Sequence, residues 1–327
     1  MRPVFNQARK DIKRIVLTEG EDERVLHAAQ QVVSQKLAFP ILVGDAKLIE
    51  ERLHSQGLTI QPGKDFELVD IKNSPYYEAS WKEYYNLRKR KGVTEEMARR
   101  RLKANSTLVG ALLVRLGHAD GLVCGTMGRF HDHFAVMEEV IGYNNPEKEA
   151  FAMNALISNK GNFFIADTYI NENPTAEQLA KGTLMCAAEM KRFGLKPKVA
   201  LVSNSNYGSH CSPDARKMQR ALEIIRELDP TLEIDGEMQA DVALDETMRK
   251  SIFPETTLSG AANLLVMPNV EAANISYNLL RVNATNGITV GPILMGLNKP
   301  VQIVTPISTV RRIVNMIALA VVDAQRQ

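Results

Sequence analysis

The sequence has little cysteine and no long apolar run, and each absence narrows what the protein is. Its 327 residues include only Cys124, Cys186 and Cys211, which lie far apart. Three scattered cysteines exclude a disulfide framework and favour a reducing compartment. No apolar run approaches the roughly 20 residues that span a bilayer, and the first residues lack the apolar stretch of a secretory signal. We therefore expect a cytoplasmic protein without a membrane partner.

The sequence also lacks an excess of charge of one sign. Lysine and arginine number 40, aspartate and glutamate 38, and the net charge is +2. This balance gives no argument for nucleic acid as a partner, and none is expected. The densest basic run is residues 88–91, followed by residues 99–101 and Lys103. Helical spacing distributes these cations around two helices, which favours ordinary solvated faces.

Two nucleotide-binding motifs are missing as well. The chain contains no G-x-G-x-x-G or G-x-x-x-x-G-K-[ST] pattern, so a nicotinamide or nucleoside-triphosphate fold within it is unsupported. Its length is nevertheless ample for about two domains with sizeable cores.

Short apolar runs alternate with longer helical patterns along the chain. This rhythm predicts α/β architecture with mostly parallel sheets, because strands covered by helices on both faces are apolar throughout. A basic last turn before Gly194 predicts a helix end, and Ser212 followed by Pro213 predicts a helix start. The expected strands are residues 14–18, 40–43, 66–69, 121–124, 163–166, 199–202, 264–267 and 302–304, and the expected helices include residues 21–35, 175–193, 212–227 and 271–282.

Three predicted strand ends carry residues suited to a ligand, since open α/β sheets bind ligands beyond the carboxyl ends of their strands. Residues 203–209 are small or polar and precede a helix; they either offer hydroxyl and amide groups to a phosphate or form an ordinary capping loop. Residues 123–128 contain glycines that permit close backbone approach. Residues 290–296 are apolar and either wall a pocket or turn the chain.

The segment His131-Asp132-His133 has the composition of a metal site. On a strand the two histidines would share a face, whereas on a helix they would diverge by roughly 200°. We expect a helix after Gly128 and therefore no metal. Cys124 and Cys211 are interpreted as small apolar side chains.

Motif-like stretches follow one another in order along the chain, at residues 14–24, 87–94, 119–125, 165–167, 235–241, 262–269, 274–277, 291–296 and 299–301. Together they resemble the phosphate acetyltransferase (phosphotransacetylase) family over nearly the whole chain. The resemblance implies two α/β domains with an interdomain cleft, similar to isocitrate and isopropylmalate dehydrogenases. It places domain I at residues 1–137 plus 294–327 and domain II at residues 138–293, and it implies a homodimer or higher homo-oligomer.

The family reaction moves an acetyl group between coenzyme A and phosphate, which requires a base for the thiol and cations for the developing charge. In the family these come largely from a Ser-Arg pair after the Lys-Pro-Val stretch, an Asp six residues later, and an arginine after the Asp-Gly strand. Here Thr305 and Pro306 stand at the Ser-Arg pair, Arg312 at the base and Ala135 at the later arginine. Arg88 is the active-site arginine that still matches. The resemblance therefore implies a family member without catalytic residues.

Together with residues 203–209 and 304–315 and the opening residues 2–9, this pattern also resembles the C-terminal domain of multidomain NADP-dependent malic enzymes, which convert malate and NADP to pyruvate, CO2 and NADPH. This implies upstream malic and NADP-binding domains that hold NADP and a divalent metal. It implies no cofactor and no metal in this domain, which would bind acetyl-CoA or a related acyl-CoA as an allosteric inhibitor.

Three hypotheses remain open: a regulatory acetyl-CoA-binding domain inactive in acetyl transfer, a working acyltransferase that uses Thr305, Ser308, Arg311 and Arg312, and a purely structural dimerisation module. Asp235, Glu237 and Asp241 are either structural or functional carboxylates. The residues expected to bind acetyl-CoA are Arg88, Ser203, Asn204, Ser205, Asn206, Tyr207, Gly208, Asn263, Gly291, Thr305, Ser308, Arg311 and Arg312.

Overall fold

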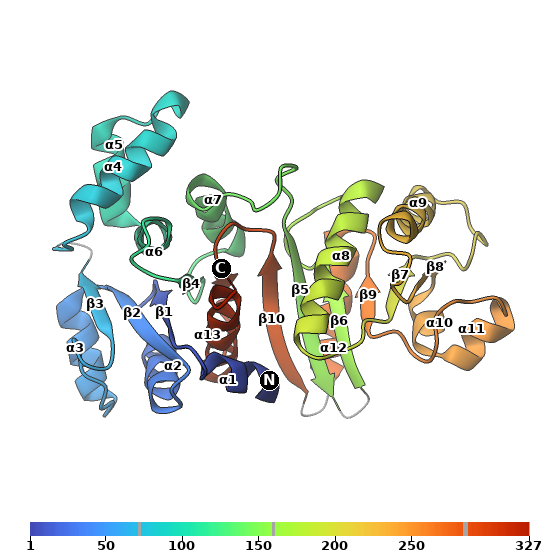
Figure 1. The fold of residues 1–327 in the computed structure, drawn as a ribbon, viewed down its shortest axis with the longest axis horizontal. Coiled ribbons are helices and arrows are strands. Elements are labelled where there is room, and N and C mark those ends of the chain that lie inside the picture. Colours follow the sequence, from blue (N-terminus) through green and yellow to red (C-terminus); the bar gives the residue numbers. More distant parts are fainter. Residues whose placement is uncertain (71–72, 159–160, 284–286, 327) are drawn as a thin grey trace. The chain divides into compact units, whose positions relative to one another are not determined.

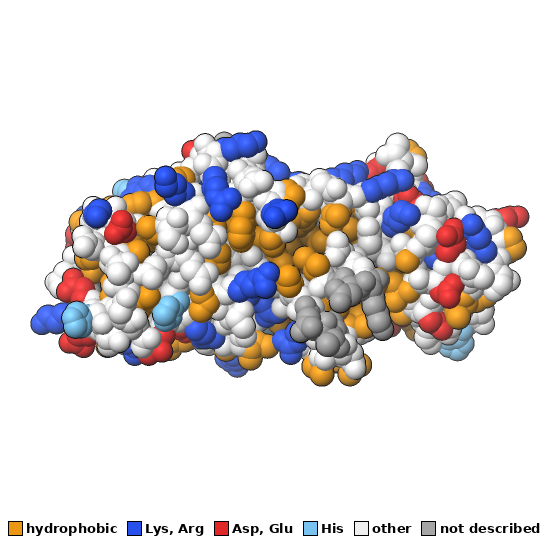
Figure 2. All heavy atoms as spheres, turned by 90° about the horizontal axis from the view of Figure 1, so that it is seen from below, with side chains coloured by type: hydrophobic (Ala, Val, Ile, Leu, Met, Phe, Trp, Pro, Cys, Tyr) orange, Lys and Arg blue, Asp and Glu red, His pale blue; other side chains and the backbone are white. Residues whose placement is uncertain are grey.

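The structure is a computed structural model that describes residues 1–70, 73–158, 161–283 and 287–326. Its contacts divide the chain into two compact units. The first comprises Met1–Lys148 and Leu297–Gln327, and the second Glu149–Gly296. No helix in the described ranges is long and apolar enough to cross a membrane. On the face drawn in Figure 2, Lys and Arg side chains are scattered rather than gathered in one patch.

The first unit contains a parallel sheet with strand order β11-β4-β1-β2-β3 (Figure 1). Each strand pairs in parallel with its neighbour, which places the carboxyl ends of all five at one edge. The apolar runs that predicted these strands were correct to within a few residues. The bounds are β1 Lys13–Leu17, β2 Ala38–Gly44, β3 Glu67–Asp70, β4 Gly121–Cys124 and β11 Val301–Ile303.

Helices cover this sheet because each presents an apolar face to it. The long helix α13 is buried along nearly its whole length and packs on β4, β1 and β11. Helix α6 packs on β1, β2 and β4, and Gly110 permits its close approach, since a Cβ there would lie 2.5 Å from Cγ2 of Thr18. The bounds are α1 Arg2–Ala8, α2 Glu23–Ser34, α3 Ala46–Ser55, α4 Tyr77–Arg88, the 3-10 turn η1 Lys89–Lys91, α5 Glu95–Ala104, α6 Ser106–Arg115, α7 Phe130–Val140 and α13 Val310–Ala324.

The second unit contains a mixed sheet with strand order β10-β5-β6-β9-β7-β8. Strands β6, β9, β7 and β8 pair in parallel, whereas β10 with β5 and β5 with β6 pair antiparallel. The sequence prediction missed β5, β8 and β10. The bounds are β5 Phe151–Ser158, β6 Gly161–Ala166, β7 Val199–Val202, β8 Ile234–Met238, β9 Leu264–Val266 and β10 Ile288–Met295.

Residues 290–296, expected to follow a strand end, lie mostly inside strand β10. The register with β5 shifts between Val290 and Ile293, and Pro292 lies within that irregularity. Strand β10 is at the edge of the sheet. A proline is tolerated at such a place because it removes no hydrogen bond that an inner strand would need.

The helices of the second unit confirm the predicted start and end signals. Ser212 caps α9 with Pro213 in the first turn, and Gly194 follows the end of α8 with a φ of 74°. Gly182 lets α8 approach the sheet, since a Cβ there would lie 2.3 Å from the ring of Phe151. The bounds are α8 Ala176–Arg192, α9 Pro213–Leu228, α10 Ala240–Leu244, α11 Glu246–Ile252 and α12 Val270–Asn283.

Candidate functional site

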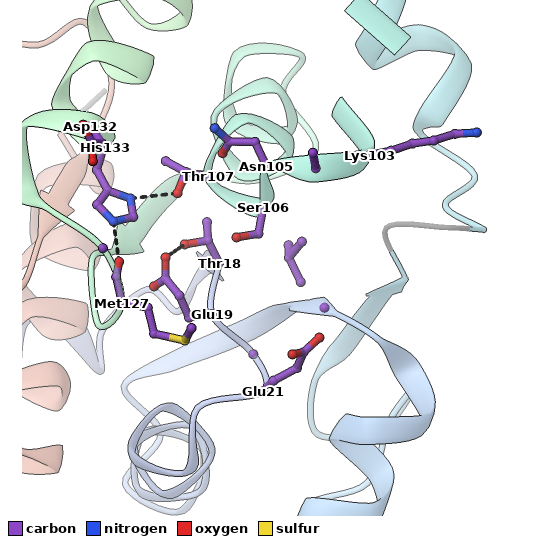
Figure 3. Close-up of a pocket in the computed structure, with 15 residues that line it drawn as sticks. Thr18, Glu19, Glu21, Lys103, Asn105, Ser106, Thr107, Met127, Asp132 and His133 are labelled. Carbon is purple, nitrogen blue, oxygen red and sulfur yellow. Dashed lines mark hydrogen bonds between the residues drawn. The ribbon is translucent and has the colours of Figure 1, made fainter. Parts of the chain in front are cut away.

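A pocket of about 420 Å³ lies at the carboxyl edge of the first unit's sheet (Figure 3). It forms where the ends of β1 and β2 meet the junction of α5 and α6 and the start of α7. Glu19 and Glu21 give it acidic walls, and Lys103 and His133 are the basic groups. Its remaining lining residues are Thr18, Gly20, Val43, Gly44, Ala104, Asn105, Ser106, Thr107, Met127, Gly128 and Asp132.

Glu19 fastens two strand ends together in this pocket. Its carboxylate accepts hydrogen bonds from Thr18 Oγ1 at 2.7 Å and from Gly125 N at 3.0 Å, with longer contacts at 3.4 Å from Thr126 N and Oγ1. Burial raises the pKa of Glu19, although these bonds and the nearby His133 oppose the rise. The carboxylate therefore joins the end of β1 to the loop after β4.

His133 is held in the wall of the pocket by both ring nitrogens. Nδ1 lies 2.8 Å from Thr107 Oγ1, and Nε2 lies 2.6 Å from the carbonyl oxygen of Met127 (Figure 3). The carbonyl can only accept, so Nε2 donates to it. The predicted helix after Gly128 is confirmed as α7, on which His131 and His133 diverge. No group of three or more metal-ligating side chains occurs in the described part of the chain.

Arg24 organises the segment that follows β11. Its Nη1 donates to the carbonyl oxygens of Pro306 at 2.5 Å and Ser308 at 3.1 Å, and its Nη2 donates to that of Thr126 at 2.9 Å and to Asp22 Oδ2 at 2.6 Å. Arg24 belongs to the stretch 14–24 that resembles the family, but no role was predicted for it. Its position at the start of a helix directly after a strand could have indicated a role at the carboxyl edge of the sheet.

The departures from the family pattern lie in the first unit. Thr305 and Ser308 are buried, with their hydroxyl oxygens 3.3 Å apart. Pro306 and Arg311 are exposed, whereas the side chain of Arg312 is buried on α13. Ala135 is exposed on α7.

Arg88, at the end of α4, is partly buried in an ion pair. Its Nη2 lies 3.1 Å from Oε1 of Glu139 on α7. The other carboxylate oxygen accepts from Tyr84 at 3.0 Å and lies 3.3 Å from Nη1 of Arg101. The predicted solvated faces of residues 88–103 thus include two arginines that share one carboxylate.

The loop after β7 uses most of its polar groups within the second unit. Tyr207 stacks on Phe253, and burial together with Asp235 raises the pKa of Tyr207 to about 12 against the opposing bond to Thr256. Several backbone amides expected to face a phosphate are already bonded: Ser205 N to Ser203 Oγ at 2.9 Å, Asn206 N to Ser209 Oγ at 2.9 Å, Tyr207 N to Glu237 O at 2.8 Å and Gly208 N to Glu237 Oε1 at 2.8 Å.

Beside this loop lies a pocket of about 490 Å³. The amino ends of α9 and α12 border it, and Ser203, Asn204 and Asn269 line it. Its remaining lining residues are Val202, Ser212, Pro213, Asp214, Ala240, Met267, Pro268, Ala272 and Ser276. Helix amino ends favour anions, because their backbone N–H groups point outward.

Of the residues predicted to bind acetyl-CoA, only Ser203 and Asn204 line this pocket. Asn263 and Gly291 are two of those that do not. Asn263 precedes β9 and bonds to the backbone before β7, through Lys198 N at 2.7 Å and Lys196 O at 2.9 Å. It therefore lies at the amino edge of the sheet, opposite the 203–208 loop. Gly291 lies in β10, where a Cβ would come within 2.8 Å of Asn154 Oδ1 and Met153 O.

The carboxylates left open between structural and functional roles differ in their contacts. Asp235 accepts from Thr256 Oγ1 at 2.6 Å and Thr257 N at 2.9 Å, and Glu237 accepts from Gly208. Both are buried. These bonds give Asp235 and Glu237 a structural role beneath the 203–208 loop.

A family model described as phosphate acetyl/butaryl transferase matches residues 1–321. The chain belongs to this family. It is 33% identical over 326 residues to a phosphate acetyltransferase of Corynebacterium glutamicum, covering 98% of this chain and 96% of that protein. A solved phosphotransacetylase from Streptococcus pyogenes superposes with a TM-score of 0.90 at 29% identity, covering 100% of this chain and 99% of that one. The α/β fold with mostly parallel sheets is therefore that of a phosphotransacetylase.

A second group of relatives is longer than this chain. An NADP-dependent malic enzyme of Escherichia coli is 54% identical over 327 residues, which cover all of this chain but 43% of that protein. The chain thus spans less than half the length of these curated relatives and corresponds to their phosphotransacetylase-like part.

Proposed function

We propose that this chain is a regulatory and oligomerisation domain of an NADP-dependent malic enzyme, and that it binds acetyl-CoA without transferring acetyl groups. In this proposal, domains upstream bind NADP and a divalent metal and convert malate to pyruvate and CO2. Acetyl-CoA bound to the present domain inhibits that reaction by favouring one assembly state over another. The high identity to malic enzymes supports the assignment to such a parent polypeptide.

The observation that carries the proposal is the chemistry of residues 305–312. Pro306 offers only its carbonyl, which Arg24 already binds, and Arg312 is a buried cation that cannot accept a proton. The family pattern requires an arginine and a carboxylate at these places. Loss of a general base alone typically costs 10²–10⁴-fold in rate, and loss of an electrostatic clamp costs a similar factor.

Ligand affinity does not require that chemistry, because binding and transition-state stabilisation depend on different interactions. The pocket beside residues 203 and 204 has two helix amino ends and uncharged polar walls suited to phosphate groups of acetyl-CoA. We assign the phosphate groups of the ligand to this pocket of the second unit. Arg88 and residues 305–312 of the first unit stay predicted ligand residues. The cleft between two domains, like that of isocitrate dehydrogenase, stays a prediction.

An exposed apolar stripe supports the oligomerisation part of the proposal. Ile275, Leu279 and Val282 recur at helical spacing on α12 and are 59%, 61% and 79% exposed. Large apolar side chains grouped on one helix face are typical of protein interfaces. Leu279→Lys should therefore shift the chain toward monomer in sedimentation velocity, whereas Lys217→Glu on α9 should not.

The test of ligand binding and activity uses two measurements on the same preparation. Calorimetry with acetyl-CoA should give a dissociation constant below the millimolar range. Coenzyme-A-dependent cleavage of acetyl phosphate should be far below the roughly 10 per second of ordinary enzymes. Turnover at that level would reject the regulatory proposal, and absence of heat at millimolar acetyl-CoA would favour a structural dimerisation module.

A second candidate is a working phosphate acetyltransferase, favoured by the near-complete coverage of the Corynebacterium glutamicum enzyme. It would have to use Thr305, Ser308, Arg311 and Arg312 in place of the family residues. Under the regulatory proposal, the double variant Pro306→Arg, Arg312→Asp should gain more acetyl transfer activity than the two single variants gain in sum, since paired catalytic groups are non-additive. High activity in the unmodified chain would favour this second candidate.

A further inference from the structure

Three helices of the first unit meet at the carboxylate of Glu139. Helix α4 contributes Arg88 and Tyr84, α5 contributes Arg101, and α7 contributes Glu139 itself. One carboxylate oxygen faces Arg88 Nη2 at 3.1 Å. The other faces the Tyr84 hydroxyl at 3.0 Å and Arg101 Nη1 at 3.3 Å.

Within this cluster the pair of Arg88 and Glu139 is better shielded from water than a surface ion pair, whereas the side chain of Arg101 is 44% exposed. The side chains of Arg88 and Glu139 are only 20% and 19% exposed. Burial, followed by the charge of Glu139, raises the pKa of Tyr84 against the opposing charge of Arg101. The phenol therefore stays protonated and donates to Glu139, which holds the carboxylate between the two guanidinium groups.

Arg88 retains an unused hydrogen-bond donor. Arg88 Nε is buried and has no hydrogen-bond partner among the described residues. Two guanidinium groups around one acceptor are the arrangement that binds phosphoryl oxygens most strongly, through paired charge-assisted hydrogen bonds. In this chain a side-chain carboxylate occupies the acceptor position.

We propose that Glu139 is a specificity-determining residue that masks Arg88 and Arg101 from small phosphoryl dianions such as inorganic phosphate and acetyl phosphate. The proposal rests on the proposed function in treating Arg88 as part of the ligand site. A dianion approaching Arg88 meets the fixed negative charge of Glu139, and that repulsion offsets part of the attraction to the arginines. Like charges placed at a recognition site exclude wrong ligands in this way.

The decisive variant is Glu139→Gln, which keeps the shape of the side chain and removes its charge. Inorganic phosphate, titrated into the full 327-residue chain by calorimetry, should bind at least about tenfold more tightly to the variant, or about 1.4 kcal/mol. Adding Arg88→Gln to this variant should abolish the gain. If Glu139→Gln does not fold, Glu139→Met removes the same charge and should give the same gain.

The matched control is Glu83→Gln on α4. Glu83 forms a partly exposed ion pair of 2.8 Å with Arg115, and removal of its charge should leave phosphate affinity unchanged. No gain in a folded Glu139→Gln chain, a gain that survives Arg88→Gln, or an equal gain in the control would each overturn the masking role.

Acetyl-CoA titrations of the same variants separate this inference from the proposed function. If acetyl-CoA binds none of the chains while phosphate affinity follows Glu139, the proposed function fails and the masking role stands. If acetyl-CoA binds the unmodified chain while phosphate stays weak in Glu139→Gln, the masking role alone fails.

Discussion

In the first unit Glu19 follows β1 and accepts hydrogen bonds from Thr18 and from the loop after β4, whereas in the second unit Asp167 follows β6 and accepts mainly from its own next turn. Asp167 bonds to the backbone N–H groups of Tyr169 at 3.1 Å and Asn171 at 2.9 Å, and also to Ala152 N at 3.2 Å. Burial raises the pKa of both carboxyl groups against these bonds. A buried carboxylate after a strand thus joins the end of β1 to the loop after β4 in the first unit, whereas in the second unit it mainly closes the turn after β6 and also bonds to β5.

The pockets of the two units also differ in the charged residues that line them. The pocket of the first unit is lined by the acidic residues Glu19, Glu21 and Asp132 and by the basic residues Lys103 and His133. The pocket of the second unit has one acidic lining residue, Asp214, whose Oδ1 lies 2.9 Å from Lys217 Nζ. Because a phosphate group is repelled by carboxylates and attracted by helix amino ends, the second pocket suits acetyl-CoA better.

Of the substitutions that test this comparison, Asp167→Ala should cause the largest loss of stability. It deprives several buried N–H donors of their acceptor at about 1–3 kcal/mol each, so we expect the free energy of unfolding to fall by roughly 3–5 kcal/mol. Urea denaturation followed by circular dichroism measures this loss. Glu223→Gln, which breaks an exposed pair with Arg220, should cost less than about 0.5 kcal/mol. A comparable loss in both would show that Asp167 has no special role.

Glu19→Ala should have the next largest effect, roughly 2–3 kcal/mol, because the amides of Gly125 and Thr126 lose their acceptor. Glu19→Gln should cost less. The Thr18 hydroxyl can rotate to accept from the new amide, while the amide oxygen still faces Gly125. Equal losses for the two substitutions in the same denaturation assay would contradict this account of the contacts.

The pH dependence of Glu19→Gln checks the electrostatic part of that account. Burial raises the folded-state pKa of Glu19 above its unfolded value near 4.5. Stability from this group is therefore full below about pH 4.5 and is lost as the pH rises through the folded pKa. Because the variant lacks this titration, its disadvantage relative to the unmodified chain should shrink as pH rises. A disadvantage that grows instead would mean that the pKa of Glu19 is lowered.

The charge difference between the pockets predicts that a new carboxylate changes acetyl-CoA affinity in one pocket and not in the other. Ala272→Glu places a carboxylate in the first turn of α12, where the helix tolerates it, and should weaken acetyl-CoA binding about tenfold, or about 1.4 kcal/mol. Ser106→Glu places one in the first turn of α6 and should leave the affinity unchanged. Calorimetry on both variants decides which pocket the ligand uses. The reverse result would assign it to the first unit.

The smallest expected effect is that of Asn263→Ala. Its side chain joins the backbone at Lys196 and Lys198 on the amino edge of the sheet, and its loss should cost about 1 kcal/mol of stability. Acetyl-CoA affinity should not change, because the 203–208 loop lies at the other edge. A marked drop in affinity without a drop in stability would restore Asn263 to the ligand site.

The sequence by itself determined the family, the α/β class and most of the parallel strands, since buried parallel strands are apolar runs that need no partner to be recognised. It also determined the end of α8 and the start of α9, because capping is a local property of a few residues. The departures from the family pattern at Thr305, Pro306 and Arg312 were also visible in the sequence, because each is a single residue next to a recognisable motif.

Only the tertiary structure decided the rest. Strand β8 contains Asp235 and Glu237, and a strand can bury these carboxylates only because Thr256, Thr257 and Gly208 reach them from distant segments. Likewise, the sequence placed Arg88 in a basic run and in a family motif, but only the fold brought Glu139 of α7 against it. Partners separated in sequence by 20 to 50 residues leave no periodic pattern, so their pairing becomes apparent only when the chain is folded.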